Sequence, residues 1–209
     1  GFELDKYFKT DDLKKCSRFW IILFKTILSK LYHWKIYVVG SVEYQYPNHL
    51  FQAGYFLDKK YYDENTIDFK HLLLSEKNQS LLKDIQNSNS VGVHIRRGDY
   101  MTKQNLVIFG NICTQKYYHD AIRIITEKVN DAVFYVFSDD ISWVQTHLDI
   151  PNAVYVNWNT GESSIYDMYL MSSCKYNIIA NSTFSYWAAR LNKKTNMVIY
   201  PSKWYNTFT

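Results

Sequence analysis

The sequence predicts an α/β fold in which a parallel β-sheet carries helices on both of its faces. Beyond the polar segment Asn87–Ser90, short apolar runs rich in β-branched and aromatic residues alternate with longer amphipathic segments. This alternation is typical of strands joined by right-handed helical crossovers. Several of the expected strands also end in polar clusters, and ligands bind at the carboxyl ends of strands in such sheets. We therefore expect a Rossmann-like sheet with a binding site along one rim.

The expected elements follow in chain order from helical periodicity, apolar alternation and turn signals. The strand over Val91–Ile95 alternates apolar residues with small or polar ones and runs directly into charged residues. The earlier part of the chain is expected to hold helices over Leu13–Leu31 and Phe69–Ile85 and a strand over Lys35–Gly40. The later part is expected to hold strands over Val133–Phe137, Val154–Asn157, Tyr176–Ala180 and Met197–Tyr200, and helices over Gln115–Val129, Ile141–His147, Ser163–Ser173 and Phe184–Leu191.

Length and composition set limits on the function. With 209 residues and 47% apolar content, the chain can bury one good core. Its net charge of +4 suits an anionic ligand such as a nucleotide diphosphate, and because the lysines are scattered it does not indicate a nucleic-acid surface. Cys16, Cys113 and Cys174 are odd in number and far apart, which argues against a metal site or a disulfide framework.

The expected amino-terminal helix has one charged side. Between residues 12 and 35, Lys14, Arg18 and Lys25 form a basic face opposite a broad aromatic and aliphatic face. Such a segment either packs against a core with its basic face in solvent, which we favour, or lies on an anionic membrane. The longest apolar run, Phe19–Phe24, has six residues, far fewer than the roughly 20 that a membrane-spanning helix needs.

The segment Val91–Tyr100 is the most informative in the chain. Of the 24 basic residues, 19 are lysine and five are arginine, yet Arg96 and Arg97 are adjacent at the end of an expected strand. A guanidinium group is a planar fork that can hold phosphate or carboxylate with two hydrogen bonds, which lysine cannot do. Gly98 would allow a sharp turn close to a ligand, and Asp99 places a carboxylate beside the cations. An exposed Arg–Asp ion pair in a loop is the alternative interpretation.

Two further strands are expected to end in polar clusters at the same rim. Ser138–Asp140 follows one strand, and Asn181–Ser185 leads from another strand into a helix. Ser182 or Thr183 can cap that helix, and the amino terminus of a helix favours phosphate. Capping alone would explain one hydroxyl, but three of them, with Ser185 included, favour a phosphate contact. Polar clusters after three strands therefore predict one binding site.

The string His94-x-Arg96-Arg97-Gly98-Asp99-Tyr100 resembles the signature of the α-1,2-fucosyltransferases, glycosyltransferase family 11. The resemblance is dense from about Leu50 to Trp204 and thin before that. Tyr186 stands where a second tryptophan is usual, and the family's opening glycine-rich strand with a Gly-Asn-Gln element has no counterpart here. Three later segments resemble further motifs of the family in the expected order: Phe109–Ile122, Val136–Trp143 and Asp167–Ala189.

This resemblance implies a two-domain GT-B fold with an incomplete amino-terminal domain. We expect the chain to lack the opening βα unit of that domain. Residues 1–86 are then expected to form a partial, acceptor-side domain, and residues 90–209 a Rossmann-like domain that binds the nucleotide sugar. Selectivity for the acceptor would come largely from the amino-terminal part.

The activity implied by the resemblance is inverting transfer of L-fucose from GDP-β-L-fucose to the 2-hydroxyl of a terminal β-galactoside, in a glycan or a surface polysaccharide. Two alternatives are a fragment that binds the nucleotide sugar without turnover and a glycosyltransferase that uses another nucleotide-sugar donor. Asn78 and Asn181 begin glycosylation sequons, but a glycan on Asn181 would block the expected site. This favours a bacterial cytoplasmic enzyme, which would lie at the inner face of the membrane if the basic helix binds there.

The leaving diphosphate requires preorganised donors. We assign Arg96, and secondarily Arg97, to the β-phosphate, with a structural ion pair to Asp99 as the alternative for one of them. Asp139 is expected to accept hydrogen bonds from the guanine base. His94 is expected near the base or the diphosphate, with a satisfied core role as the alternative. Asp99 is the candidate general base, although the arginines would weaken it, and late departure of the proton without a base is the alternative.

No metal or other cofactor is expected. Asp139 and Asp140 are adjacent in the sequence, so in an extended segment they point to opposite faces and cannot both chelate one ion. Arginine is therefore expected to take the place of a metal at the diphosphate.

Overall fold

The computed structural model describes residues 4–9, 37–39, 51–53 and 67–206, together with positions 19, 22 and 27. The chain divides into two compact units, one formed by residues 8–68 and the other by residues 1–7 and 69–209. The unit that contains the sheet therefore takes in residues that precede the expected boundary between residues 86 and 90, which stays a prediction. The reason is helix α3 (Glu76–Asn87), which buries Leu81 and Ile85 within the larger unit and contacts its sheet.

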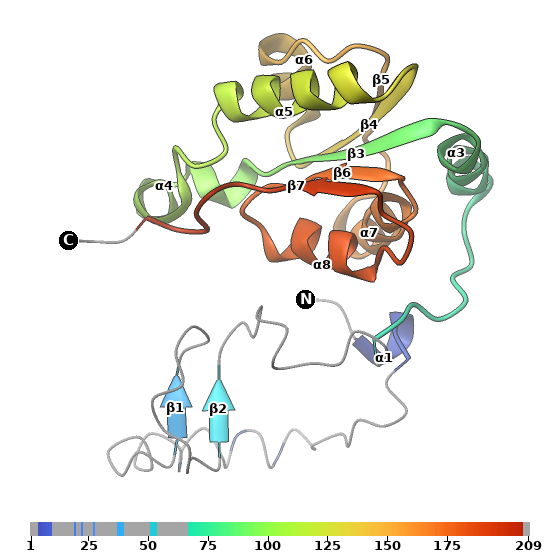
Figure 1. Ribbon diagram of the computed structural model, residues 1–209. Helices are drawn as coiled ribbons and strands as arrows, with labels where there is room; N and C mark the ends of the chain where they lie inside the picture. The colour runs from blue at the N-terminus through green and yellow to red at the C-terminus, as the bar shows by residue number, and fades with distance from the viewer. Residues whose placement is uncertain are drawn as a thin grey trace. The chain divides into compact units, whose positions relative to one another are not determined.

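The larger unit is built on a sheet of five parallel strands in the order β5-β4-β3-β6-β7 (Figure 1). All five strands that the sequence predicts are present, with boundaries that differ by at most two residues, so the prediction of a parallel sheet is confirmed. The strands are β3 (Asn89–Ile95), β4 (Ala132–Ser138), β5 (Ala153–Val156), β6 (Tyr176–Ile178) and β7 (Met197–Ile199).

The order of the strands creates a switch point between β3 and β6. The chain begins this sheet in the central strand β3, proceeds outward to β4 and β5, and then returns to the other side of β3 with β6 and β7. β3 pairs with β4 from Asn89 to Ile95 and with β6 from Val91 to Val93. The segments that follow β3 and β6 therefore leave the same rim side by side, which is where open α/β sheets bind their ligands.

Helices cover both faces of the sheet, as expected, with α5 and α6 on one face and α7 and α8 on the other (Figure 1). Each of these four helices lies within one residue of its expected bounds. A short helix that the sequence did not predict, α4, follows the arginine segment. The bounds are Lys103–Phe109 for α4, Gln115–Lys128 for α5, Ile141–His147 for α6, Ser164–Ser172 for α7 and Thr183–Leu191 for α8.

The helix expected over Phe69–Ile85 is shorter at its start than predicted. α3 begins only at Glu76, because Ser75 caps it by accepting a hydrogen bond from the backbone N–H of Asn78 at 3.3 Å. The preceding residues are held in a non-helical conformation, in which the N–H of Lys70 bonds to the carbonyl of Tyr7 at 2.8 Å.

The central strands are buried on both faces, which makes the rim rigid. Val91, Val93 and Ile95 of β3 are at most 1% exposed and pack with Ile125 of α5. Each fully buried side chain of this size contributes about 1.5–3 kcal/mol to folding. On the opposite face Gly92 leaves room for neighbours, since a Cβ there would lie 2.8 Å from Asn177 Nδ2.

The smaller unit contains two parallel strands, β1 (Tyr37–Val39) and β2 (Phe51–Ala53). β1 confirms the strand expected over Lys35–Gly40. The helix expected over Leu13–Leu31 and its basic face lie outside the described residues, apart from the exposed positions 19, 22 and 27. Within the part of the chain that the structure describes, no helix has the length and apolar character required to cross a membrane.

Candidate active site

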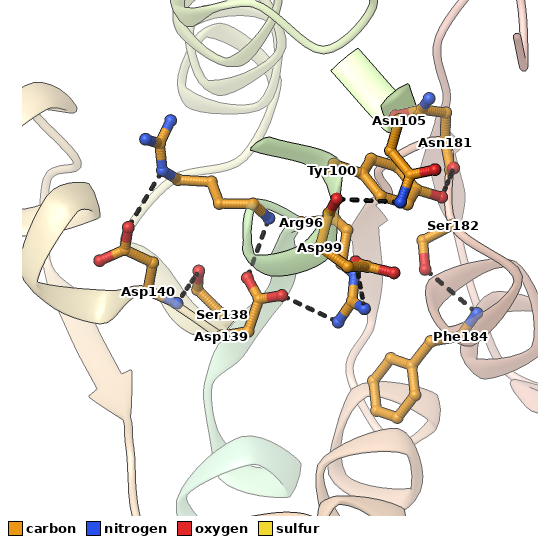
Figure 2. A network of polar contacts seen from close by, with 11 residues as sticks. Arg96, Asp99, Tyr100, Asn105, Ser138, Asp139, Asp140, Asn181, Ser182 and Phe184 are labelled. Carbon is orange, nitrogen blue, oxygen red and sulfur yellow. Dashed lines mark hydrogen bonds and ion pairs between the residues drawn. The ribbon is translucent and has the colours of Figure 1, made fainter. Parts of the chain in front are cut away.

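Three segments that follow strands meet at the rim, and they contain the residues that the sequence predicted (Figure 2). The β3 and β4 segments are joined by an ion pair of 2.8 Å between Arg96 Nη1 and Asp139 Oδ2. The β3 and β6 segments are joined by the hydroxyl of Tyr100, which donates to the carbonyl of Asn181 at 2.8 Å. The predicted polar clusters therefore form one continuous constellation at the switch point.

Arg96 lies at the centre of this constellation. Besides Asp139, its guanidinium contacts Asp99 through a bond of 2.6 Å between Nη2 and Oδ1. The structural partner of Asp99, which the sequence left open between two arginines, is thus Arg96. A guanidinium has five N–H donors, so two carboxylates can orient it while donors remain for a ligand. Its side chain is 33% exposed and therefore accessible from the rim.

Arg97 points toward α6 and is held there. Its Nε lies 3.2 Å from Asp140 Oδ2, and its guanidinium carbon lies 3.7 Å from the centroid of the Trp143 ring. Trp143 in turn stacks on His147, with ring centroids 4.5 Å apart and an interplanar angle of 11°. Through these contacts Arg97 ties the loop to α6, and its secondary assignment to the β-phosphate stays a prediction.

Asp139 organises the turn that carries the arginines. Its Oδ1 accepts a hydrogen bond of 2.9 Å from the backbone N–H of Arg97, while its Oδ2 pairs with Arg96. Gly98 makes this approach possible, since a Cβ at that position would collide with Asp139 Oδ2. The sequence interpretation of Gly98 as a site of close approach is correct, but the group that approaches is a side chain of the protein.

The neighbouring residues Ser138 and Asp140 shape the start of α6. Asp140 Oδ1 caps the helix by accepting from the N–H of Trp143 at 3.1 Å, and its own N–H donates to Ser138 Oγ at 3.0 Å. Asp139 and Asp140 thus pair with the side chains of different arginines. Among the described residues, no group of three histidines, cysteines or acidic residues is placed to hold a metal ion.

The segment after β6 is more structural than predicted. Asn181 is 2% exposed, and its Nδ2 donates to the carbonyls of Phe109 and Trp204, each at 3.1 Å. Both amide hydrogens are thereby bonded to the backbone, and the predicted donor-binding role of Asn181 stays a prediction. Ser185 is fully buried, and its hydroxyl donates to backbone carbonyls, among them that of Ala180 at 3.3 Å.

The amino terminus of α8 remains directed at the rim. Ser182 is the N-cap, and its hydroxyl accepts from the N–H of Phe184 at 3.3 Å. Thr183 begins the helix and is half-buried. The N–H groups of a helix's first turn and the helix dipole favour an anion, so this end of α8 complements Arg96 across the switch point.

His94 is a buried residue with an unsatisfied nitrogen. It is 5% exposed, its ring packs against Phe184 with centroids 5.2 Å apart, and its Nδ1 has no hydrogen-bond partner among the described residues. Burial, followed by the positive charge of Arg96, lowers the pKa of His94 to about 3. The imidazole is therefore neutral at physiological pH.

A second polar cluster, which the sequence did not reveal, surrounds Asp167 at the start of α7. Asn159 Nδ2 donates to Asp167 Oδ1 at 2.6 Å, and the Trp158 indole N–H donates to Asn78 Oδ1 at 2.7 Å. Burial raises the pKa of Asp167 to about 7, although the bond from Asn159 opposes this shift. Asp167 belongs to a segment of the family resemblance, and its partner Asn159 is bonded in turn to Asn78, 81 positions away in the sequence.

The model of Glycosyl transferase family 11 matches residues 11–208, nearly the whole chain. The chain belongs to this family. Membership confirms the resemblance read from the arginine string and places the constellation around Arg96 within a glycosyltransferase family.

Curated relatives of this family-11 chain come from bacteria and mammals. It is 35% identical over 176 residues to "Alpha-1,2-colitosyltransferase" of Escherichia coli, a match that covers 79% of this chain and 57% of the relative. It is 44% identical over 122 residues to "O-antigen biosynthesis glycosyltransferase WbnK" of Escherichia coli, covering 57% and 40%. It is 29% identical over 128 residues to "Galactoside alpha-(1,2)-fucosyltransferase 2" of Pongo pygmaeus, covering 58% and 37%. The chain thus spans about half the length of these relatives or less.

Solved structures similar to the family-11 chain are fucosyltransferases. The fucosyltransferase NodZ from Bradyrhizobium aligns over 93% of this chain and 67% of its own, with a TM-score of 0.48 and 15% identity. POFUT1 in complex with GDP-fucose aligns over 76% and 55%, with a TM-score of 0.47 and 14% identity.

Proposed function

We propose that the whole protein transfers L-fucose from GDP-β-L-fucose to the 2-hydroxyl of a terminal β-galactoside, with inversion at the transferred carbon. The observation that carries the proposal is the placement of Arg96. In a chain of family 11, this guanidinium is oriented by two carboxylates at the carboxyl ends of β3 and β4, and the segment that carries it is bonded through Tyr100 to the segment that leads into α8. The acceptor is a glycan or the precursor of a surface polysaccharide.

The chemistry requires stabilisation of the departing GDP. As the glycosidic bond breaks, negative charge grows on the β-phosphate, and donors that are already in place stabilise it. Arg96 supplies charged N–H groups, the first turn of α8 supplies backbone N–H groups, and the neutral ring of His94 packs against Phe184 in that turn. These groups take the role that a metal ion would otherwise have.

Two carboxylates are proposed to act on the substrates. Asp99 is proposed as the base for the acceptor hydroxyl; its Oδ1 pairs with Arg96, so a base role falls to Oδ2. Asp139 is proposed to recognise guanine. Because each of its oxygens already has a partner in the loop, guanine would have to use the second lone pair of each oxygen. Nucleotide binding by the Asp139→Asn variant tests this contact.

The GT-B architecture and the acceptor side of the reaction belong to the same proposal. The smaller unit would contribute to the acceptor side, together with the parts that the longer relatives possess. A bacterial cytoplasmic location, with peripheral membrane contact through the basic face near the amino terminus, completes the proposal.

The test is a binding and transfer screen. GDP, ADP and UDP affinities of the 209-residue chain are measured by calorimetry, and fucose transfer to β-galactosides is measured with the full-length protein. We expect preference for GDP and formation of an α-1,2 linkage. Equal affinity for the three nucleotides would overturn the donor assignment. If the 209-residue chain binds GDP without turnover, while the full-length protein transfers fucose, the 209-residue chain is a binding fragment.

Transfer of colitose is a second candidate, favoured by the name of the relative that matches 79% of this chain. Colitose lacks the 3-hydroxyl of fucose, so the two donors differ in one hydrogen-bonding group. Competition between GDP-fucose and GDP-colitose for the full-length protein separates them. A site built to bond the 3-hydroxyl rejects the deoxy sugar strongly, whereas an apolar pocket discriminates only weakly.

A further inference from the structure

The loop that carries Arg96 is anchored on both sides of the switch point. On the β4 side, Asp139 binds both Arg96 and the backbone of Arg97, and Asp140 binds the Arg97 side chain. On the β6 side, the contact is made by Tyr100, which lies in the short 3₁₀ turn η2 (Gly98–Met101). The two sides differ in chemistry, because the first uses charges and the second a neutral hydroxyl.

Tyr100 takes part in a closed circuit of three contacts. Its hydroxyl donates to the carbonyl of Asn181 at 2.8 Å, and its ring stacks on Phe109 with centroids 4.8 Å apart and an interplanar angle of 17°. Asn181 closes the circuit, since its side chain donates to the carbonyl of Phe109 at 3.1 Å. Figure 2 shows Tyr100 and Asn181 directed toward each other beside Ser182, the cap of α8.

This circuit connects two groups that must act on one ligand. Arg96 precedes Tyr100 by four residues, and Asn181 immediately precedes Ser182, the cap of α8. The guanidinium and the helix amides lie on different segments, so their separation depends on how those segments are joined. Because a misplacement of about 1 Å can reduce a rate about a hundredfold, the joint between the segments is functionally important.

We propose that Tyr100 is a positioning residue, whose hydroxyl fixes the distance between Arg96 and the amino terminus of α8 so that both contact the same diphosphate. The inference rests on the proposed function, which places the β-phosphate between these two groups. The Tyr100 ring stacks on Phe109 and lies 5.7 Å from the guanidinium carbon of Arg96, and the hydroxyl is the part of this side chain that bonds to the segment leading into α8.

The Tyr100→Phe variant removes this bond and leaves the ring stack in place. The readout is the ratio of GDP to GMP affinity, measured by calorimetry on the 209-residue chain. GMP lacks the β-phosphate, so its affinity does not report on Arg96 or on the proposed spacing. A role confined to stability would lower the melting temperature without changing this ratio.

Tyr135→Phe is the matched control. The Tyr135 hydroxyl also makes one part-buried hydrogen bond, of 3.1 Å with Ser88 Oγ, but at the opposite end of the sheet. Its removal should therefore have a comparable effect on stability and none on nucleotide selectivity. Melting temperatures of both variants verify that each is folded under the assay conditions.

We expect the wild-type chain to prefer GDP over GMP, and Tyr100→Phe to reduce that preference about two- to tenfold, the effect of one hydrogen bond, with unchanged GMP affinity. In an Arg96→Lys background the same change should add little, since it acts through Arg96. If the wild type prefers GDP but Tyr100→Phe leaves the ratio unchanged, or weakens GDP and GMP binding equally, the positioning role of Tyr100 is overturned. The phosphate assignment of Arg96 is not affected by that result. A wild type without preference for GDP over GMP would overturn the phosphate assignment of Arg96, and this inference with it.

Discussion

Replacing Arg96 by lysine retains the positive charge but removes the planar guanidinium group with its two terminal nitrogens. In the structure, the two terminal nitrogens of Arg96 reach two carboxylates at once, Asp139 at 2.8 Å and Asp99 at 2.6 Å. The single nitrogen of lysine cannot reproduce this bridge and also present a donor at a fixed angle to the phosphate. Loss of a charge-assisted donor to the leaving group should raise the activation free energy by about 2–4 kcal/mol, a decrease in kcat of roughly 30- to 900-fold.

The effect on folding should be much smaller. Arg96 is 33% exposed, so solvent screens its ion pairs and their loss should lower the free energy of unfolding by about 1 kcal/mol or less. The assay is transfer from GDP-fucose by the full-length protein, with kcat and KM determined separately and stability followed by thermal melting. Arg123→Lys is the control, because Arg123 also forms an ion pair, at 3.0 Å to Glu127, but on the exposed surface of α5.

Two results would refute this reasoning in different ways. Near-normal kcat and KM in Arg96→Lys would mean that the guanidinium does not touch the reacting groups. An increased KM with unchanged kcat would mean that Arg96 binds the donor equally in the ground state and the transition state, and thus does not stabilise the leaving group selectively.

Four further predictions concern the same unit. Asp139→Asn should weaken GDP binding and reduce the preference for GDP over ADP and UDP, whereas Asp140→Asn should leave that preference intact. Calorimetry with the three nucleotides measures the preference of each variant. If neither variant changes it, Asp167→Asn is the next variant to measure. Transfer should persist in EDTA, and loss of activity that Mn²⁺ or Mg²⁺ restores would contradict the metal-independent proposal. Gly98→Ala should abolish transfer and lower the melting temperature, because its Cβ collides with Asp139; a fully active variant would show that the turn can adapt. Because burial raises the pKa of Asp167 from 3.8 to about 7, its contribution to stability should be lost as pH rises through 7; urea midpoints at pH 5 and pH 8 should therefore differ less in Asp167→Asn than in wild type.

Local patterns in the sequence were sufficient for the framework of the larger unit. Strands such as β3 are recognisable because apolar residues repeat along a few neighbouring positions, and α6 because a polar cap precedes a helical pattern. Parallel pairing follows from the alternation of these elements, since each helix returns the chain to the same edge. The site could therefore be placed at the rim from the ends of β3, β4 and β6 alone.

Features set by non-local contacts were wrong or missing. The helix expected from Phe69 begins at Glu76, since the preceding residues bond to the backbone of the amino-terminal segment. The short helix α4 was not predicted, because its four large apolar residues are consecutive, from Leu106 to Phe109, and give no amphipathic pattern. Local patterns also did not indicate that α3 belongs to the same compact unit as a sheet that follows it in sequence.

The sequence alone determined which side chains gather near the carboxyl ends of three strands: two arginines, three aspartates, a histidine and several hydroxyl groups. Only the tertiary structure decided which partners each of them has within the protein. Arg97 is neutralised by Asp140, 43 positions away, and Asn181 is committed to a carbonyl 72 positions away. Side chains of the same type thus acquire different roles because burial and hydrogen-bond partners depend on residues that are distant in sequence and adjacent in space.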